Sequence, residues 1–332
     1  MRVGVRIPPC APVTEVVAAA AEAERLGFDE VWLPDSQLLW RDVFTVAATA
    51  AAATSRVTLG IAVSTVVTRH PSVVASAART VGEVALDRFV LGLGVGNSSV
   101  VPVGLRASTG SELRSGLATI RALLAGEEVD FGGVRSRMRD PVPVPLHVAA
   151  SGPRNLRLAG EIADGVILLS GVSPRTLAAA TSTVREGAAG RGTPPRTTVS
   201  AYCKVTDDVE RDARELKPVC AGIAQNGGVS FLALAGVHVD VPPIPLPGAY
   251  PDVVHAEDWA AAVAACGPYI SDEAAVAFAR EFCLFGSGEE IAHRLEAVRA
   301  AGADAVFLQH VGSYDLPYPL LNDVAGKVLP LL

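Results

Sequence analysis

The sequence predicts an α/β protein folded as a closed (β/α)8 TIM barrel, and three observations favour this fold. Short apolar segments alternate along the chain with longer amphipathic segments, which is the pattern of strands and helices in a parallel sheet. Eight such strands can be assigned, which is the number that this barrel needs. The length of 332 residues suits one barrel of about 250 residues that carries insertions. A doubly wound open sheet is the alternative, because the same alternation permits it.

The first half of the chain supplies four units of a strand and a helix. Each predicted strand is mostly apolar, and each predicted helix repeats its apolar residues at helical spacing. The strands are expected at 3–7, 30–33, 57–63 and 89–93, and the helices after them at 13–26, 43–54, 72–86 and 111–124.

The second half supplies the remaining strands and two long connections. The strands are expected at 146–150, 165–169, 198–205 and 305–309. One helix is expected to begin at Pro153, and further helices are expected over 174–186, 207–217, 289–301 and 319–331. The segment 97–110 is rich in Val, Gly and Ser, and the segment 226–267 contains five prolines, so we expect both to be insertions in the βα loops. Long loops of this kind lie over the active face of a barrel. We therefore expect one TIM-barrel domain over 1–332, with both insertions above its active face.

The composition favours a large buried core and a small-molecule ligand. Half of the residues are hydrophobic (50%) and 19% are charged, which argues against disorder. The net charge of -7 disfavours nucleic acid and acidic membranes as partners. The uncharged run 219–239 is interrupted by polar residues, so we expect loop and buried barrel packing there and no membrane span.

Cysteine and histidine spacing predicts neither a disulfide framework nor a metal site. The five cysteines are scattered and form no CxxC pair, and the six histidines form no HxxxH or HExxH pair. The chain begins Met-Arg-Val-Gly-Val-Arg, which lacks the features of a signal peptide. We therefore expect reduced thiols and a cytoplasmic location.

The segment 145–171 carries the clearest binding signal. A predicted strand runs into Ser151, Gly152 and Pro153 at the start of a predicted helix. The first N–H groups of a helix have no partner within the helix, and its dipole adds positive charge there, so this junction can hold an anion. Gly152 permits close approach to the main chain, and Pro153 fits the first helical turn. An ordinary strand-to-helix turn has the same sequence features.

Other candidate residues follow neighbouring strands. Alternating glycines, Gly92, Gly94 and Gly96, end the fourth strand, where glycine is costly unless a group passes close to the backbone. Asn97 follows them and could meet a ring or a substrate, although it also suits a turn. Asp35, after the second strand, could bind a cofactor ring or cap the next loop. With Ser170 after the sixth strand, these positions suit a flat ring with a phosphorylated tail.

Four sequence blocks resemble the bacterial-luciferase-like superfamily. The resemblance is greatest to its methylenetetrahydromethanopterin reductase branch, whose members use the deazaflavin coenzyme F-420. The blocks are Ala-Glu-Arg-Leu-Gly-Phe-Asp-Glu-Val-Trp-Leu-Pro-Asp at 23–35, Leu-Gly-Ile-Ala-Val at 59–63 with Thr-Arg-His-Pro at 68–71, Leu-Gly-Leu-Gly-Val-Gly at 91–96, and Ala-Ala-Ser-Gly-Pro at 149–153 with Ala-Gly-Glu-Ile-Ala-Asp-Gly at 159–165.

The resemblance implies a barrel with the deazaflavin at the carboxyl ends of its strands, and a homodimer. It implies a cis peptide bond between Ala62 and Val63 behind the central ring of the coenzyme. Together with the strand-end positions described above, it predicts that the residues contacting the coenzyme are Asp35, Ala62, Val63, Ser64, Thr65, Gly94, Gly96, Asn97, Ala149, Ala150, Ser151, Gly152, Pro153 and Ser170.

The candidate catalytic residues are Asp35, Ser36 and Asn97, and two of them depart from the family pattern. Relatives have Asp-His at 35–36 and a carboxylate at 97. A serine hydroxyl and an amide do not titrate near neutral pH, so neither replaces those groups in proton transfer. Trp40 is a candidate wall of the pocket or a packing residue, and 226–267 is expected to set specificity.

These observations predict a coenzyme F-420-dependent oxidoreductase that transfers hydride between the coenzyme and a small organic substrate. An FMN-dependent luciferase-like monooxygenase is the alternative within the same fold. A non-catalytic barrel that binds a deazaflavin or a metabolite is the alternative from another class.

Overall fold

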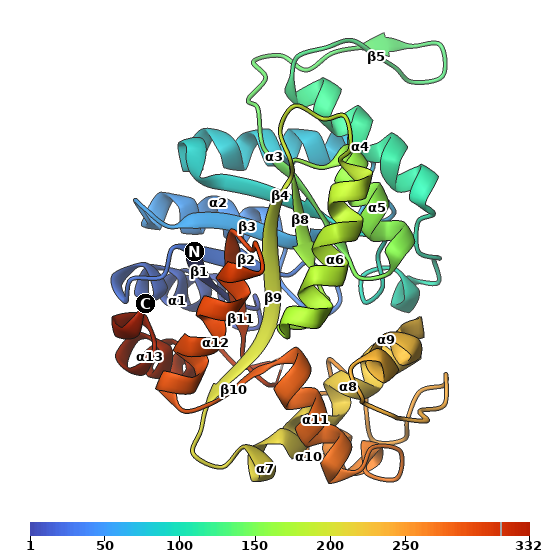
Figure 1. Ribbon diagram of the computed structural model, residues 1–332. Helices are drawn as coiled ribbons and strands as arrows, with labels where there is room; N and C mark the ends of the chain where they lie inside the picture. Colours follow the sequence, from blue (N-terminus) through green and yellow to red (C-terminus); the bar gives the residue numbers. More distant parts are fainter. Residues whose placement is uncertain (313) are drawn as a thin grey trace.

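Eight parallel strands close into a barrel in the computed structural model, which describes residues 1–312 and 314–332 and, at Ser230, the backbone alone. The barrel strands are β1 (Arg2–Arg6), β2 (Glu30–Leu33), β3 (Thr58–Ser64), β4 (Phe89–Leu93), β7 (Leu146–Ala150), β8 (Gly165–Leu168), β9 (Arg196–Val205) and β11 (Ala305–Gln309). Each pairs with the next in this order, and β11 pairs back to β1. The sheet therefore has no open edge in the barrel, so the TIM-barrel prediction is confirmed and the open-sheet alternative is wrong (Figure 1).

Helices surround the strands in the order that the sequence predicts. They are α1 (Val13–Arg25), α2 (Val43–Ala53), α3 (Pro71–Ala85), α4 (Gly110–Leu124), α5 (Pro153–Ile162), α6 (Pro174–Gly187), α12 (Gly288–Ala300) and α13 (Tyr318–Lys327). Their apolar faces pack against outward side chains of the strands, such as Val5, Leu33 and Leu91, in one large hydrophobic core. Local sequence fixes several helix starts, because Thr109 with Glu112 and Ser287 with Glu290 form capping boxes before α4 and α12.

The barrel interior is filled beneath its mouth. The Glu30 carboxylate is fully buried, accepts a hydrogen bond from the Trp32 indole nitrogen at 2.9 Å and pairs with Arg196. Above it, Trp32 stacks on Phe307 with ring centroids 5.3 Å apart and lies 6.0 Å from the His147 ring. This layer fills the barrel interior below the mouth, so the end where the strands finish is the place for a ligand.

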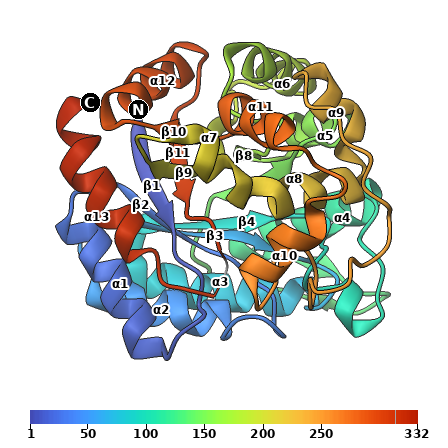
Figure 2. The ribbon, with the colours of Figure 1, turned by 90° about the horizontal axis from the view of Figure 1, so that it is seen from below.

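The chain between β9 and β11 builds a second hydrophobic cluster outside the barrel wall. Its elements are α7 (Val209–Asp212), η3 (Ala213–Leu216), α8 (Lys217–Ile223), η4 (Ala224–Gly228), α9 (Val229–Leu234), α10 (Trp259–Cys266), α11 (Asp272–Phe282) and β10 (Leu284–Gly286), which pairs with the end of β9. These helices lie beyond the ends of the strands, at the bottom of Figure 1 and in front of the barrel in Figure 2. The assignment of the whole chain to one domain stays a prediction.

The run 219–239 differs from its prediction. Instead of loop and barrel packing it forms α8, η4 and α9, and its buried residues belong to the second cluster. Cys220 and Leu232 are fully buried there. The run is thus partly buried, as its apolar residues predict, but the core that buries these residues is not that of the barrel.

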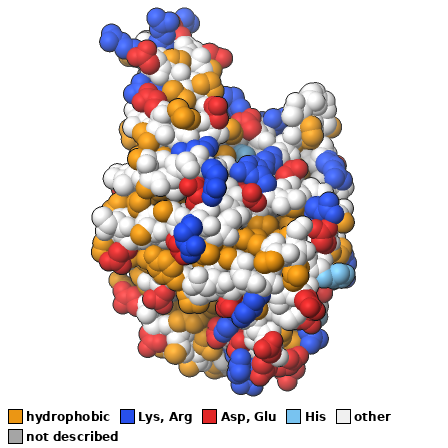
Figure 3. Space-filling model, turned by 90° about the vertical axis from the view of Figure 1, so that its left-hand side faces the viewer, with side chains coloured by type: hydrophobic (Ala, Val, Ile, Leu, Met, Phe, Trp, Pro, Cys, Tyr) orange, Lys and Arg blue, Asp and Glu red, His pale blue; other side chains and the backbone are white. Residues whose placement is uncertain are grey.

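A two-stranded hairpin marks the opposite pole of the molecule. Strands β5 (Val129–Asp130) and β6 (Arg135–Ser136) project between α4 and β7. Arg135, Arg137 and Arg139 lie in or just after this hairpin, and Figure 3 shows basic side chains gathered at the projecting tip.

Among the described residues, none of the helices is both long enough and apolar enough to cross a membrane. In that same part of the chain, no group of three or more His, Cys, Asp or Glu side chains is placed to hold a metal ion.

Candidate functional site

The ends of β3 and β4 lie in close contact at the barrel mouth. The Ala62–Val63 peptide bond is cis, as the resemblance implies, and the pairing of β3 with β4 shifts register between Ile61 and Ser64. The Gly94 N–H donates to the Ser64 carbonyl oxygen at 2.9 Å. A Cβ at Gly94 would lie 2.8 Å from a methyl of Val63, so glycine is required there by the neighbouring strand.

Gly96 continues this contact above the strand. Its φ of +91° is in the region that favours glycine, and a Cβ there would lie 2.4 Å from Val100 and 3.2 Å from the Thr65 hydroxyl. Thr65 is itself buried. The predicted residues 62–65 and 94–96 are thus brought together into one wall of the mouth.

Asp35 is held in a network of polar side chains. Its carboxylate accepts a hydrogen bond from the Ser64 hydroxyl at 2.6 Å and pairs with Arg69. Arg69 also reaches Asp42, the residue that caps α2, at 3.0 Å. The Asp35 side chain is buried, with 1% of it exposed, so this arrangement fixes the loop after β2 to the end of β3.

Ser36 and Asn97 both take part in hydrogen bonds with other loops. The Ser36 and Ser98 hydroxyl oxygens lie 2.6 Å apart, which ties the loop after β2 to the loop after β4. Asn97 is exposed, and its Nδ2 donates to Oδ1 of Asn226 at 3.1 Å. The two segments predicted as insertions therefore touch at this point.

The end of β7 leads into the turn for which an anion site is predicted. The helix α5 begins at Pro153, and its N-cap residue Gly152 provides no side-chain cap. A Cβ at Gly152 would meet no atom within 4 Å. No side chain at the N-cap therefore occupies the first-turn N–H groups, and the space beside Gly152 is open, as an anion site requires.

Ser170 lies at the adjoining strand end. The Leu169 N–H donates to the Ala150 carbonyl at 3.2 Å, which places Ser170 beside the turn at Ser151. Its side chain is fully buried, and its hydroxyl has no hydrogen-bond partner within the described part of the chain. A buried hydroxyl that lacks a partner costs free energy, so a bound polar group would satisfy it.

A second group of side chains lines the opposite half of the mouth, and sequence reasoning missed most of it. Arg6 ends β1, Tyr202 lies near the end of β9, and His310 follows β11. The Arg6 guanidinium lies 5.8 Å from the centre of the Trp40 ring. Burial, with the Arg6 charge as a smaller cause, lowers the pKa of His310 to about 4, so this imidazole is neutral at pH 7.

Strand alternation is the signal that could have found Arg6. In Arg-Val-Gly-Val-Arg, Val3 and Val5 face the helices, so Gly4 and Arg6 face the barrel axis. A charged residue at the carboxyl end of an inward-facing series lies where barrels bind ligands. Trp40 was named as a candidate wall, and it packs 5.3 Å from Tyr314 and 6.2 Å from His255 between ring centroids.

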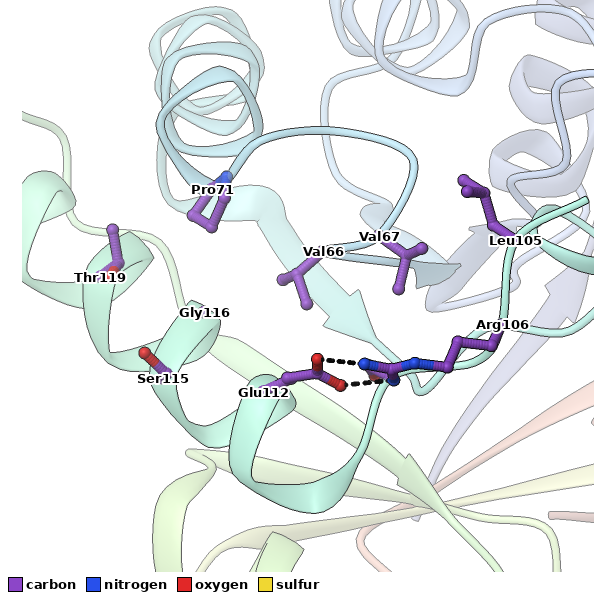
Figure 4. A pocket seen from close by; sticks show the side chains of 10 residues that line it. Val66, Val67, Pro71, Leu105, Arg106, Glu112, Ser115, Gly116 and Thr119 are labelled. Carbon is purple, nitrogen blue, oxygen red and sulfur yellow. Dashed lines mark hydrogen bonds and ion pairs between the residues drawn. The ribbon is translucent and has the colours of Figure 1, made fainter. Parts of the chain in front are cut away.

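A separate hollow of about 400 Å³ lies beside the mouth, between the loops after β3 and β4 and helix α4 (Figure 4). The Arg106 guanidinium and the Glu112 carboxylate pair across one side of it, with nitrogen to oxygen distances of 2.6 and 2.8 Å. None of the predicted site residues lines it. We therefore place the site in the mouth and not in this hollow.

Residues 1–305 match the family described as luciferase-like monooxygenase. The chain belongs to the luciferase-like family. The family resemblance that four sequence blocks carry is thereby confirmed.

Two curated relatives of this luciferase-like chain have informative names: one is named as an F-420-dependent dehydrogenase and the other as a pterin reductase. An F-420-dependent glucose-6-phosphate dehydrogenase of Beutenbergia cavernae is 42% identical over 177 residues, which is 47% of this chain and 53% of that protein. A 5,10-methylenetetrahydromethanopterin reductase of Methanolobus tindarius is 31% identical over 227 residues, 65% of this chain and 68% of the relative. The chain thus spans about half the length of the dehydrogenase that it matches.

Solved structures agree on the fold of the luciferase-like chain. The coenzyme F-420-dependent tetrahydromethanopterin reductase of Methanopyrus kandleri superposes with a TM-score of 0.77 at 20% identity, covering 99% of this chain and 98% of that one. A type II Baeyer-Villiger monooxygenase from the CAM plasmid of Pseudomonas putida, in complex with FMN, has a TM-score of 0.67 at 16% identity, with 99% and 98% covered. At these identities the likeness concerns the barrel alone.

Proposed function

We propose that this protein is a coenzyme F-420-dependent oxidoreductase that transfers hydride between the deazaflavin and a small organic substrate. The observation that carries the proposal is the turn at Gly152, where uncapped N–H groups and open space lie beside the unpartnered hydroxyl of Ser170. This turn suits the phosphate of a coenzyme tail. The name of the dehydrogenase relative described above supports F-420 as that coenzyme.

The residues of the mouth suit a flat ring next to that phosphate. Ala62, Val63 and Ala149 pack on the apolar layer of Trp32 and Phe307 and form the floor of the mouth. We assign the face of the ring to this floor and its edge to Ser64, Thr65, Gly94 and Gly96. When bound, the deazaflavin supplies the hydride chemistry, while the protein orients the reactants and excludes water.

The candidate catalytic residues receive hydrogen-bonding and positioning roles in this proposal. Asp35 is engaged by Ser64 and Arg69, so its carboxylate positions the end of β3. Ser36 and Asn97 can donate and accept hydrogen bonds at the rim but do not titrate near neutral pH. Hydride transfer does not itself require a protein acid, so these residues are compatible with redox chemistry.

The proposal includes a small-molecule substrate, a homodimer and a cytoplasmic location. The family resemblance supports the homodimer, and the scattered cysteines, which form no CxxC pair, support a reducing compartment such as the cytoplasm. The net charge of -7 favours a partner other than nucleic acid.

Titration with coenzyme F-420, followed by deazaflavin fluorescence, tests the proposal. We expect saturable binding in the micromolar range or tighter, and no displacement by an excess of FMN. Binding of FMN in place of F-420 would instead favour the monooxygenase alternative. Oxidation or reduction of any substrate with the bound coenzyme would exclude a non-catalytic barrel.

A pair of glycine variants tests the phosphate assignment within the same titration. In Gly152→Leu the new side chain enters open space, so the barrel should fold while affinity for F-420 falls by a factor of about 100, as expected for a blocked set of charge-assisted hydrogen bonds. Gly192→Leu is the matched control, because a Cβ there also meets no atom within 4 Å and this loop is at the other pole. Unchanged affinity in Gly152→Leu would contradict the assignment.

A further inference from the structure

The barrel mouth divides into two halves along the strand order. The residues assigned to the coenzyme follow β3, β4, β7 and β8, which are consecutive in the sheet. The other half follows β9, β11, β1 and β2, which are also consecutive. Because a bound ring would lie on the floor between the halves, the second half faces the position from which a substrate must approach.

Arg6 is the cation of the second half. It points towards the barrel axis, because it alternates with Gly4, whose Cβ would lie 2.8 Å from the Cβ of the interior residue Glu30. Its guanidinium lies 5.8 Å from the Trp40 ring, so the loop after β2 covers one of its sides. Burial lowers the pKa of Arg6, which is the direction expected where the surroundings solvate a charge poorly.

The acidic side chains near Arg6 do not neutralise it. The titratable groups that act on its charge are Tyr202 and Cys10, and burial raises the pKa of both, so both are neutral at pH 7. Asp252 of the insertion accepts hydrogen bonds from the backbone N–H groups of Val254 and His255, and its carboxylate lies 3.0 Å from the His255 ring nitrogen. Within the described residues, Arg6 therefore has no carboxylate partner.

An arginine without an anionic partner in a largely enclosed site is costly, and a bound anion removes that cost. The guanidinium presents a planar fork of donors that matches a carboxylate or a phosphate. The groups around it are flat or polar: the Trp40 ring, the Tyr202 phenol and the neutral His310 imidazole. The Gln309 amide below them is fixed by its 2.7 Å hydrogen bond to the Ser200 hydroxyl.

We propose that Arg6 is a specificity-determining residue that binds an anionic oxygen group, a carboxylate or a phosphate, on the organic substrate. This inference rests on the proposed function, because it assumes that the opposite half holds the coenzyme. Arg6 then fixes one end of the substrate on the β9, β11, β1, β2 side, and the reacting carbon faces the floor of the mouth. Trp40 covers the substrate, and the insertion residue His255 closes the pocket behind Trp40.

Binding of three small probes, measured by calorimetry, tests this proposal. Benzoate and phenyl phosphate each carry an anionic group on a flat ring, and benzamide is the uncharged counterpart of benzoate. We expect the wild-type protein, saturated with F-420, to bind at least one of the anions about tenfold or more tightly than benzamide. A preference for benzoate indicates a carboxylate substrate, and a preference for phenyl phosphate indicates a phosphorylated one.

Substitutions of Arg6 show whether this residue is responsible for binding the anionic probe. Arg6→Met should weaken binding of the preferred anion by a factor of about ten or more, while Arg6→Lys should retain part of it. Arg137→Met is the matched control, because it removes the same charge near the hairpin at the opposite pole and should bind the anion as the wild type does. Equal affinity in wild type and Arg6→Met, or no anion binding by the wild type, would overturn the proposal.

Further measurements distinguish a failure of the Arg6 proposal from a failure of the proposed F-420-dependent function. Titration of each variant with F-420 reports coenzyme binding, and a thermal melt reports folding. Failure of the wild type to bind F-420 counts against the proposed function, while the anion comparison, repeated without coenzyme, still tests Arg6. If Arg6→Met does not fold, Arg6→Gln provides the same loss of charge with a polar side chain, and the same outcomes apply.

Discussion

His147 is an uncharged residue of the barrel interior, although histidine titrates near neutral pH when it is exposed. Its ring lies beside Trp32, and a Cβ at Gly165 would lie 2.4 Å from its Nε2, so glycine makes the space for it. Its Nδ1 has no hydrogen-bond partner among the described residues. Burial, with the Arg196 charge as a smaller cause, lowers its pKa to about 4.

This pKa predicts that stability falls as the pH drops. The folded-state pKa of about 4 is below the unfolded value of 6.5, so between these values the unfolded chain binds a proton that the folded chain does not. The free energy of unfolding should therefore decrease below pH 6.5 by up to about 1.4 kcal/mol per pH unit until pH 4. Urea unfolding between pH 7 and pH 4.5 measures it.

Two variants isolate this contribution. His147→Leu should unfold with a shallower dependence on pH, and His310, whose pKa is lowered in the same direction, should leave a residual slope. His293→Leu, on the exposed face of α12, should keep the slope of the wild type. Identical slopes for all three proteins would contradict the assignment.

For single residues, the sequence predicts which residues lie in the barrel mouth better than it predicts their hydrogen-bond and ion-pair partners. Asp35, Ser64 and the turn at Gly152 all lie in the mouth, as their places after strands predict. The pairing of Asp35 with Arg69 could not be predicted, because the partner comes from another loop and its sequence also suits a helix start. Arg6 was missed because a single charged residue at the end of a strand has many ordinary explanations.

Helices α5 and α6 pack unusually closely, and two glycines make this possible. A Cβ at Gly160 would lie 2.2 Å from the carbonyl oxygen of Val184, and a Cβ at Gly187 would lie 2.0 Å from that of Arg157. Both contacts are with backbone atoms, so no side-chain rotation can relieve them. The position of α5, and with it the turn at Gly152, therefore depends on this crossing.

Gly160→Ala should accordingly destabilise the protein, although alanine is the better helix former. Displacing α6 should lower the free energy of unfolding by about 1–3 kcal/mol, as other overpacked sites do. The control is Gly326→Ala in the exposed part of α13, where a Cβ meets no atom within 4 Å, and there we expect a gain of about 0.5–1 kcal/mol. Denaturant unfolding of both variants measures the difference. An increase in the free energy of unfolding in both would show that α6 can move aside without loss of stability.

Most elements of the barrel could be predicted, because each repeats a strong apolar pattern at one spacing. The prediction of one continuous helix over 207–217 is wrong, because the chain there forms the short helices α7 and η3 and the start of α8. The helices α9 and α10 lie inside 226–267 and were not predicted. They are short, and the prolines between them interrupt any periodic pattern.

The molecule as a whole contains two hydrophobic clusters of different construction. One lies between the strands and the surrounding helices, and its buried residues come from 3–203 and 284–328. The other draws on 213–285 and consists of short helices joined by irregular segments. The apolar composition of 219–239 predicts that part of this run is buried, but composition alone cannot show which core buries that part.

This construction predicts unequal local stability. Amide hydrogens of α8 and α10 should exchange through openings of lower free energy than those of β1 to β4, because short helices with irregular connections lose fewer contacts when they open. Hydrogen exchange measured by mass spectrometry on peptides from both regions gives the comparison. Equal opening free energies would mean that the two clusters unfold as one unit.

The division of the mouth has a consequence for how such a chain can change over time. The half proposed for the coenzyme comes from one continuous stretch, about 58–170, whereas the opposite half combines the first forty residues with the part of the chain that begins at β9, after residue 195. A single genetic exchange between related genes after residue 171 would therefore transmit the coenzyme half unaltered while replacing Tyr202, His255 and His310. New substrates could be acquired in this way without the coenzyme having to be bound anew.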